Sequence, residues 1–233
     1  MFKLPRPMAI GQLRFGGRLG WARGATGALI GVALAAVFGL SLPDAYHWPW
    51  IVAPIGASAV LVFAVPASPL AQPWSVLGGS MLSALVGLII GHTIALPMLA
   101  AGLSVGIAIA VMTYTRCLHP PGGACAIVGT LAANAPDGGW LGLMLPLLLN
   151  VIALIGAGWL YNNLTGHAWP HIPVQAPPTP EIGWAGAYER ADLDAVLEEW
   201  DEVLDVNRQD LDALFRAVER RVMRRWQDER TKR

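Results

Sequence analysis

The stretch from Arg116 to Ala124 combines residue types that could bind a small anion; it reads Arg-Cys-Leu-His-Pro-Pro-Gly-Gly-Ala. Pro120 and Pro121 must end a preceding helix, because proline lacks an N–H donor and restricts the residue before it. The glycines that follow allow close backbone approach, and a helix starting there presents free N–H groups and the positive end of its dipole. With Arg116 and His119 beside it, this helix N-terminus predicts a site for a small anion.

A similar motif stands 67 residues earlier, where Pro54 holds the position of Pro121. The same offset aligns five further pairs: Gly56 with Gly123, Ala57 with Ala124, Ser58 with Cys125, Ala59 with Ala126, and Val60 with Ile127. The alignment predicts two copies of one unit, each made of a helix, a half-helix broken by Pro and Gly, and another helix. Coincidental matching of Pro, Gly and Ala in an apolar chain is the alternative.

The segments around these motifs carry almost no charge. The chain has 16 basic and 16 acidic residues, yet only Asp44, Arg116 and Asp137 lie between Gly24 and Gly166. A soluble domain carries about 25% charged residues. The uncharged tract therefore predicts a membrane protein with the lipid bilayer as a partner, and it excludes a soluble enzyme, a nucleic-acid-binding domain and a secreted disulfide scaffold.

Four stretches are long enough to cross the hydrocarbon core, which needs about 20 apolar residues in a helix. They are Ala25–Leu42, Val76–Leu96, Met98–Thr115 and Leu141–Tyr161. All four are rich in Gly and Ala, which let helices approach closely in lipid. The spacings Gly27-Gly31 and Gly102-Gly106 are typical of such contacts. Small helix faces of this kind predict a homo-oligomer, most simply a dimer.

Two topologies fit the short segments that follow Pro54 and Pro121. If both segments cross the bilayer, the chain makes six passes and the copies are inverted repeats. If both re-enter, four full spans remain and the copies are parallel. The basic residues among the first 23 place the N-terminus in the cytoplasm, and either topology puts the C-terminus there too. A cytoplasmic Arg116 favours inverted repeats, whereas the short run after Gly123 favours re-entry; we favour inverted repeats.

The last part of the chain is polar and has helical periodicity. Five prolines between Trp169 and Pro180 predict an extended linker. An acidic amphipathic helix is predicted from Asp192 to Leu204, with Asp192 as its N-cap. A second helix, starting at Asn207 or Asp210, has a basic C-terminal half and an apolar stripe of Leu211, Leu214, Phe215, Val218 and Val222. The two stripes predict an αα-hairpin, which could dimerise with a second copy or bind anionic lipid through its basic end.

Few other polar residues lie inside the spans. Asn150 is at mid-span, where Ser83 stands in the first copy, and it could line a pore or hold helices together. No Asp or Glu lies mid-span, which disfavours proton or Na⁺ coupling through a carboxylate. No nucleophile–base pair or metal cluster is recognisable in the spans either, so no enzyme activity, metal or cofactor is expected.

The tripeptide His119-Pro120-Pro121, followed by Gly122-Gly123-Ala124, resembles the signature of the HPP family of integral membrane proteins. The resemblance extends from about Arg14 to Leu164 and includes the stretch from Pro54 to Ser58. It implies four membrane-spanning helices. Plant and cyanobacterial members are linked to nitrite transport, so it also implies nitrite as a substrate. Some members append cytoplasmic CBS domains, but the tail of this chain has a different pattern, so nucleotide regulation is not implied.

These inferences define four regions and one functional hypothesis. The regions are a basic cytoplasmic segment (1–23), an HPP-type transmembrane domain (24–165), a Pro-rich linker (166–189) and a cytoplasmic helical hairpin (190–233). The hypothesis is a transporter or channel of the cell inner membrane for a small monovalent anion, most simply nitrite, bound at opposed half-helix N-termini. The expected binding residues are Gly56, Ala57, Ser58, Arg116, His119, Gly122, Gly123, Ala124, Cys125 and Asn150. The alternative is a non-transporting anchor or scaffold that assembles partners through its tail, with the HPP turn serving only as a helix break in which His119 caps a carbonyl.

Overall fold

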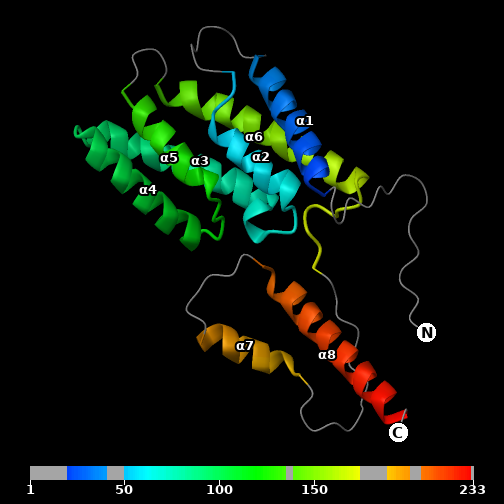
Figure 1. The fold of residues 1–233 in the computed structure, drawn as a ribbon. Helices are drawn as coiled ribbons and strands as arrows, with labels where there is room; N and C mark the ends of the chain where they lie inside the picture. The colour runs from blue at the N-terminus through cyan, green and yellow to red at the C-terminus, as the bar shows by residue number, and fades with distance from the viewer. Residues whose placement is uncertain (1–19, 41–49, 135–138, 174–187, 200–205, 232–233) are drawn as a thin grey trace. The chain divides into compact units, whose positions relative to one another are not determined.

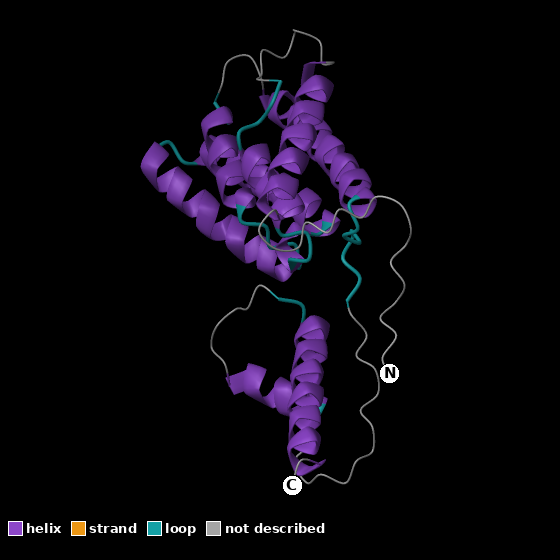
Figure 2. Ribbon diagram, turned by 45° about the vertical axis from the view of Figure 1, so that its right-hand side comes forward, coloured by secondary structure: helices purple, strands orange, loops and turns teal. Residues whose placement is uncertain are grey.

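The computed structural model describes residues 20–40, 50–134, 139–173, 188–199 and 206–231. These residues form eight α-helices, one short 3-10 helix and loops, and no strand occurs among them (Figure 2). The prediction of an all-α protein is confirmed. The chain divides into two compact units, Met1–His171 and Ile172–Arg233. Asp44 and Asp137 lie outside the described residues, as do most of the basic N-terminal segment and the middle of the Pro-rich linker.

The first unit contains long and short apolar helices in the predicted order (Figure 1). They are α1 (Gly20–Leu40), α2 (Pro54–Ala64), the 3-10 helix η2 (Pro69–Ala71), α3 (Pro73–Thr93), α4 (Pro97–Tyr114), α5 (Pro121–Ala132) and α6 (Gly139–Leu164). By length and composition α1, α3, α4 and α6 can each cross a membrane, whereas α2 and α5 are shorter. The four predicted spans and the two predicted half-helices are therefore confirmed as helices.

Proline marks where most of these helices begin. The first residues of α2, α3, α4 and α5 are Pro54, Pro73, Pro97 and Pro121. Proline suits this position because its missing N–H would have no partner in the first turn, and its fixed φ is already helical. These four prolines are thus helix starts, whereas Pro146 lies inside α6.

The α1 helix runs antiparallel to α6. The Asn150 side chain of α6 donates to the Ala35 carbonyl near one end of α1 at 2.9 Å. Near the other end, the Tyr161 hydroxyl donates to the Arg23 carbonyl at 2.9 Å. The segment that contains α2 lies beside both helices and runs parallel to α6: Asn150 accepts from the Val52 N–H, and Asn162 donates to the Val62 carbonyl.

The second half of the unit is arranged in the same way around α5. The helix packs between α3 and α4. It runs parallel to α3, because a Cβ on Gly79 would meet His119 before the start of α5, whereas one on Gly91 would meet Thr130 near its end. It runs antiparallel to α4, where Ser104 accepts a hydrogen bond from Thr130 at 2.7 Å.

Together these contacts follow the two-copy order predicted from the sequence. In each copy, α1–α2–α3 and α4–α5–α6, the first helix packs on its own half-helix and on the third helix of the other copy. The two half-helices run in opposite directions, since α2 follows α6, α5 follows α3, and the chain reverses between α2 and α3. Opposite directions are what inverted repeats require; the repeats themselves and the crossing of a bilayer by the short segments stay predictions.

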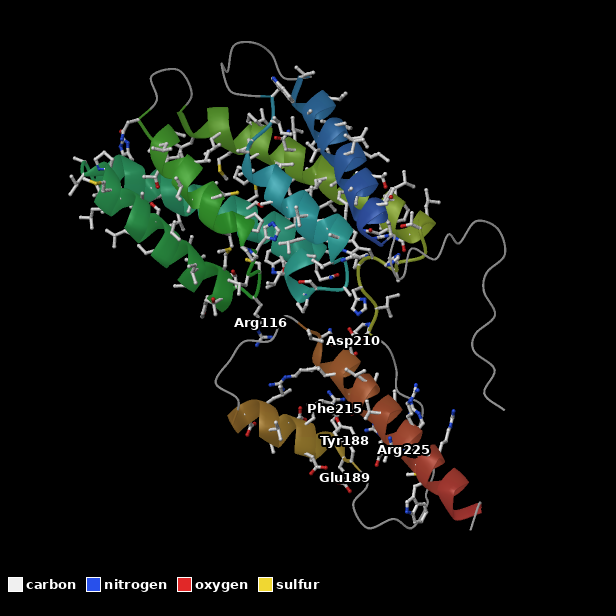
Figure 3. All side chains as sticks on the ribbon, viewed as in Figure 1. Arg116, Tyr188, Glu189, Asp210, Phe215 and Arg225 are labelled. Atoms are coloured by element: carbon white, nitrogen blue, oxygen red, sulfur yellow. The ribbon has the colours of Figure 1, made fainter. Side chains whose placement is uncertain are left out.

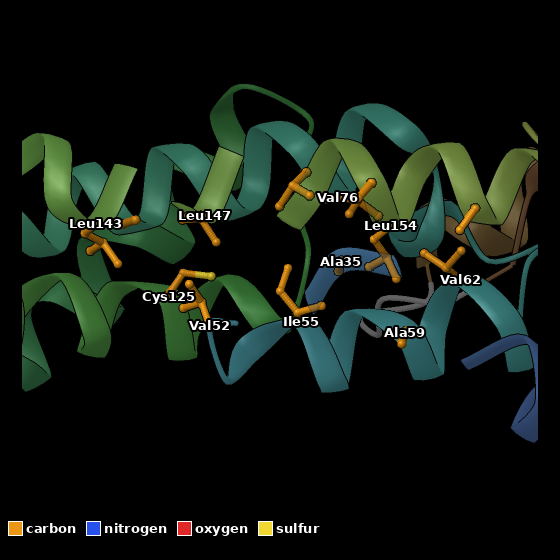
Figure 4. Close-up of a cluster of buried hydrophobic side chains, with 14 of the residues drawn as sticks. Ala35, Val52, Ile55, Ala59, Val62, Val76, Cys125, Leu143, Leu147 and Leu154 are labelled. Atoms are coloured by element: carbon orange, nitrogen blue, oxygen red, sulfur yellow. The ribbon is translucent and has the colours of Figure 1, made fainter. Parts of the chain in front are cut away.

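The core of the unit is formed where α2 and α6 meet α1 and α3. Figure 4 shows its apolar side chains, among them Ile55, Val62 and Leu154. The fully buried Phe63 fits against α1 at Gly27, where an added Cβ would lie 2.6 Å from the ring. The prediction that Gly27 and Gly31 allow close helix contact is confirmed. An added Cβ on Gly102 or Gly106 would meet no described residue within 4 Å, so no helix of the described part of the chain packs closely on this face.

The second unit contains α7 (Arg190–Glu199) and α8 (Arg208–Thr231). The α8 helix begins directly after Asn207, one of its two predicted starts, and the Asn207 side chain caps it by accepting from the Gln209 N–H at 2.8 Å. The prediction that Asp192 is the N-cap of α7 is wrong: the helix begins earlier, and the Asp192 carboxylate in its first turn accepts from the Glu189 N–H at 2.8 Å. This reach back to the residue before the helix still satisfies an unpaired amide, as in a capping box.

The apolar stripe of α8 is not covered by α7. Leu214 and Val218 remain 58% and 52% exposed, although the sequence predicts that the two stripes face each other. Tyr188 contacts α8: its ring stacks on Phe215 at 5.6 Å and its hydroxyl donates to Asp212 at 2.9 Å (Figure 3). An ion pair between Arg208 and Asp194, 3.7 Å apart, also joins α8 to α7.

Candidate functional site

The turn between α4 and α5 begins with a left-handed residue. Arg116 has φ 55°, and its N–H donates to the Thr113 carbonyl, while the Cys117 N–H donates to that of Met112. This pair of bonds is a Schellman motif, which usually places glycine at the left-handed position. The exposed Arg116 side chain points away from the helices of its unit (Figure 3).

The first amides of both half-helices already have partners. At the start of α5, the Gly122 N–H donates to the His119 carbonyl at 2.7 Å, and the Gly123 N–H donates to that of Pro120 at 3.1 Å. At the start of α2, the amides of Ile55 and Gly56 make the equivalent bonds. The positive ends of the two helix dipoles are present. The sequence predicts that these amides are free donors, whereas in the structure each of them donates to a backbone carbonyl.

His119 is fully buried and joins three segments of the chain. Its Nδ1 lies 2.9 Å from the Leu70 carbonyl, which can only accept, so Nδ1 carries a proton and donates. Its Nε2 lies 2.8 Å from the Ser58 hydroxyl of α2. The histidine before α5 therefore connects that helix to α2 and to η2, and it caps a carbonyl as the alternative hypothesis expects.

The Ser58 hydroxyl has two possible acceptors but a single proton. Besides Nε2 of His119, the Pro54 carbonyl lies 3.2 Å away. When the imidazole is neutral, the Ser58 hydroxyl donates to Nε2 of His119 and cannot donate to the Pro54 carbonyl. With an imidazolium, Nε2–H donates to Ser58, whose own proton is then available to Pro54. The geometry accommodates both protonation states of His119 without moving a heavy atom.

The structure brings four of the ten predicted binding residues into this buried junction. They are Ser58, His119, Gly122 and Cys125, all buried at the facing starts of α2 and α5. Five others lie toward the outside: Gly56, Ala57, Arg116 and Ala124 are exposed, and Gly123 is half-buried. The predicted face-to-face arrangement of the amides of Gly56 and Ala57 with those of Gly123 and Ala124 is not what the structure presents.

Asn150 has a different place. Its Oδ1 accepts from the Val52 N–H at 3.0 Å, and its Nδ2 lies within hydrogen-bond distance of the carbonyls of Ala35 and Trp50. All of these partners are backbone groups of α1 or of the segment that leads into α2. Of the two roles that the sequence leaves open, the structure uses Asn150 to hold these segments together.

Several polar groups at the junction are not predicted from the sequence. The Leu70 carbonyl and the hydroxyls of Ser80 and Ser83 on α3 are all close to the HPP turn or to α5. The signal that could have identified the α3 face is the four-residue spacing of Gly79, Ser83, Gly87 and Gly91, which places small residues on one side of the helix. Within the described ranges, no three His, Cys, Asp or Glu side chains gather as metal ligands.

Comparison with known proteins places the chain in a family. The family model described as "HPP, transmembrane region" matches residues 16–170, more than half of the chain. Two transmembrane proteins of Dictyostelium discoideum are similar: one is 35% identical over 48% of this chain and 41% of its own length, the other 31% identical over 62% and 47%. The chain thus spans less than half the length of these relatives. No solved structure matches it significantly. The match over residues 16–170, which includes the HPP turn, shows that this chain belongs to the HPP family of transmembrane proteins.

Proposed function

We propose that this HPP-family protein transports a small monovalent anion, with nitrite as the first candidate, past the junction of α2 and α5. The observation that carries the proposal is the buried pair Ser58 and His119, which joins the starts of two oppositely directed half-helices inside an apolar unit. Irregular backbone at membrane depth must pack on protein or line a polar cavity. Paired interrupted helices in two halves of a chain are typical of transporter binding sites.

The electrostatics of the junction support an anion. Two helix dipoles direct their positive ends toward it, and the described apolar helices α1 to α6 contain no Asp or Glu. Arg116, at the exposed turn before α5, supplies a positive charge that would attract an anion to one entrance. The lack of a carboxylate in these helices favours a uniport or channel mode over ion coupling. We infer no enzymatic step, and we place the protein in the inner membrane with both termini in the cytoplasm.

The proposal is tested with the full chain in proteoliposomes, using nitrite uptake as the readout. His119→Ala removes both ring nitrogens from the junction and is expected to lower uptake by at least about tenfold, since the buried hydrogen bonds that join the start of α5 to Ser58 of α2 and to Leu70 of η2 are lost. Ser58→Ala removes a single hydroxyl and tests the same junction with less risk to folding. The matched control is His92→Ala, because His92 is exposed in the last turn of α3.

Wild-type uptake no faster than in empty liposomes would contradict the proposal. So would normal uptake by a folded Ser58→Ala or His119→Ala protein. Parallel assays with nitrate, formate and chloride identify the preferred anion. An equal rate for all four would favour an unselective pore.

A second candidate function is supported by the tail. The exposed stripe of α8, with Leu214, Phe215 and Val218 uncovered, suits a surface for another protein. In this reading the first unit is an anchor, and the chain acts as a scaffold. Removing residues 172–233 distinguishes the two functions, because a transporter keeps its nitrite uptake without the tail, whereas a scaffold shows no uptake with or without it.

A further inference from the structure

We propose that the Ser83 hydroxyl on α3, with Ser80 one turn before it, donates hydrogen bonds to the transported anion at the start of α5. The inference rests on the proposed transport of an anion and identifies the side chains that hold it. Neither serine is part of the predicted site, and both lie on the face of α3 that packs against α5.

Both hydroxyls are buried without a hydrogen bond of standard geometry to the described residues. The Cys125 thiol lies close to the Ser80 hydroxyl, but a thiol is a weak donor and acceptor. A serine in a helix usually donates to the carbonyl four residues earlier, as Ser104 does at 2.7 Å. Leaving a buried hydroxyl unpaired is unfavourable, so two such groups side by side indicate a ligand that completes them.

Ser83 is aimed at the first turn of α5. A Cβ built on Gly122 would lie 2.8 Å from the Ser83 Oγ, which places this hydroxyl directly beside the glycine at the start of α5. The amides of Gly122 and Gly123 already donate to the carbonyls of the turn. The Ser83 hydroxyl is therefore the donor left over at the positive end of the α5 dipole, where an acceptor with negative charge is favoured.

The comparison of the two copies shows why the site lies at α5 and not at α2. The offset of 67 residues pairs Ser83 with Asn150, and His119 with Val52. Beside the start of α2, the long Asn150 side chain bonds to the Val52 N–H and to two carbonyls, so its polar atoms are all paired. Beside the start of α5, the shorter Ser83 side chain makes no hydrogen bond to the backbone groups that correspond to the partners of Asn150. The protein thus satisfies the polar atoms at this position beside α2, whereas beside α5 the Ser83 hydroxyl has no hydrogen-bond partner among the described residues.

The test uses Ser83→Ala and Ser80→Ala, with Ser104→Ala as the matched control. Ser104 is also a buried serine in an apolar helix, but its hydroxyl donates to Ala100 and accepts from Thr130. Two quantities are measured on the full chain: the half-saturating nitrite concentration for uptake into proteoliposomes, and the rise in unfolding temperature caused by nitrite in detergent. Ser83→Ala should raise the half-saturating concentration by about tenfold, as expected for a lost hydrogen bond to a charged ligand.

Without nitrite, Ser83→Ala should unfold at the same temperature as wild type or higher, because no protein partner is lost. Normal nitrite affinity in the folded Ser83→Ala protein would overturn the inference while leaving transport intact, and would mean that water or nothing occupies the site. If the wild type shows no uptake, the second measurement decides. Stabilisation by nitrite that Ser83→Ala abolishes would support the binding site without transport, and no stabilisation at all would overturn both proposals.

Discussion

Gly122 and Gly123 are adjacent in the HPP turn, but their surroundings differ. A Cβ on Gly122 would lie 2.7 Å from the Met112 sulfur and 2.8 Å from the Gly79 carbonyl oxygen. A Cβ on Gly123 would meet only Val105, at 3.9 Å. The requirement for glycine is therefore a packing requirement of α5 against α3 and α4, and it applies to the first of the two glycines.

This difference predicts unequal effects of two alanine substitutions. Gly122→Ala should lower the free energy of unfolding by about 1–3 kcal/mol, because the neighbouring backbone and the Met112 side chain must shift. Gly123→Ala should leave it unchanged or raise it by up to about 1 kcal/mol through helix propensity. Reversible unfolding in mixed micelles measures both. Equal effects would mean that α5 does not pack on Gly79 as described.

Arg116 occupies a backbone conformation that favours glycine, with φ 55°. We predict that Arg116→Gly raises the free energy of unfolding by about 1 kcal/mol, since the steric strain of the left-handed region is removed. The same change removes a positive charge near the turn and should lower nitrite uptake by about threefold at low ionic strength, with the difference fading in high salt.

Uptake by Arg116→Lys, which retains the charge, provides the control for this prediction. If nitrite uptake by Arg116→Gly equals that of wild type at every salt concentration, Arg116 has no electrostatic role in uptake. The geometry of the turn would then not explain why an arginine stands at this position.

At the scale of elements, Tyr188 holds the segment before α7 on α8. Tyr188 stacks on Phe215 of α8 and donates to Asp212, while Arg216 bonds Asp212 at 3.1 Å. Burial and the hydrogen bond to Asp212 raise the pKa of the Tyr188 phenol from 10.0 to about 12. Most of the α8 stripe is left for another partner.

The raised pKa of Tyr188 predicts a pH dependence. Between pH 10.0 and about 12 the folded tail keeps a phenol proton that the unfolded tail has lost. The stabilisation is complete below pH 10.0 and disappears as the pH rises through about 12. Subtracting the phenolate absorbance of Tyr188→Phe from that of wild type isolates this titration. A midpoint near 10.0 would show that Tyr188 is not docked on α8.

At the scale of the whole chain, the directions of the helices favour six passes. Residues near Ala64 lie beside Gly24 at the start of α1, whereas Trp50 lies beside Gly39 near its end. The segment that contains α2 therefore extends along most of α1 instead of turning back. A re-entrant loop would return to the end of α1 from which it came.

Cysteine labelling tests this topology, because the native Cys117 and Cys125 are buried and form an unreactive background. With six passes, Met98→Cys in the exposed first turn of α4 should react with an impermeant maleimide added outside the membrane. Ala67→Cys, between α2 and α3, should react only after the membrane is opened. The reverse pattern would support re-entrant segments and parallel copies.

The outer face of α4 predicts how copies associate. Gly102 and Gly106 are exposed, and a Cβ added to either would meet no described residue within 4 Å. Small residues at this spacing allow two helices to approach in lipid. We expect a dimer through this face, which Gly102→Leu with Gly106→Leu should convert to a monomer of unchanged stability. Light scattering in detergent measures the mass. The control is Gly156→Leu on α6, which also contacts nothing within 4 Å; a dimer that survives the double substitution would exclude this interface.

The sequence alone determines the local features of this protein. The uncharged tract predicts a membrane protein, the four spans are found close to their predicted bounds, and Pro54 and Pro121 begin the two half-helices. These features depend on hydropathy and on the backbone limits of proline, which act within a few residues. The family signature is local for the same reason, since it lies within the turn before α5.

Only the tertiary structure decides which polar groups meet. The helices are apolar on nearly every side, so no amphipathic stripe indicates which face of α3 or α5 is inside. Contacts between distant segments select the inner faces. His119 bonds to Ser58 and Leu70, Asn150 bonds to the backbone before α2, and Ser83 has no hydrogen-bond partner in the part of the chain that the structure describes. Inside such a protein, the hydrogen-bond partner of a polar side chain depends on which helix packs opposite it. The neighbouring residues in the sequence do not determine that packing.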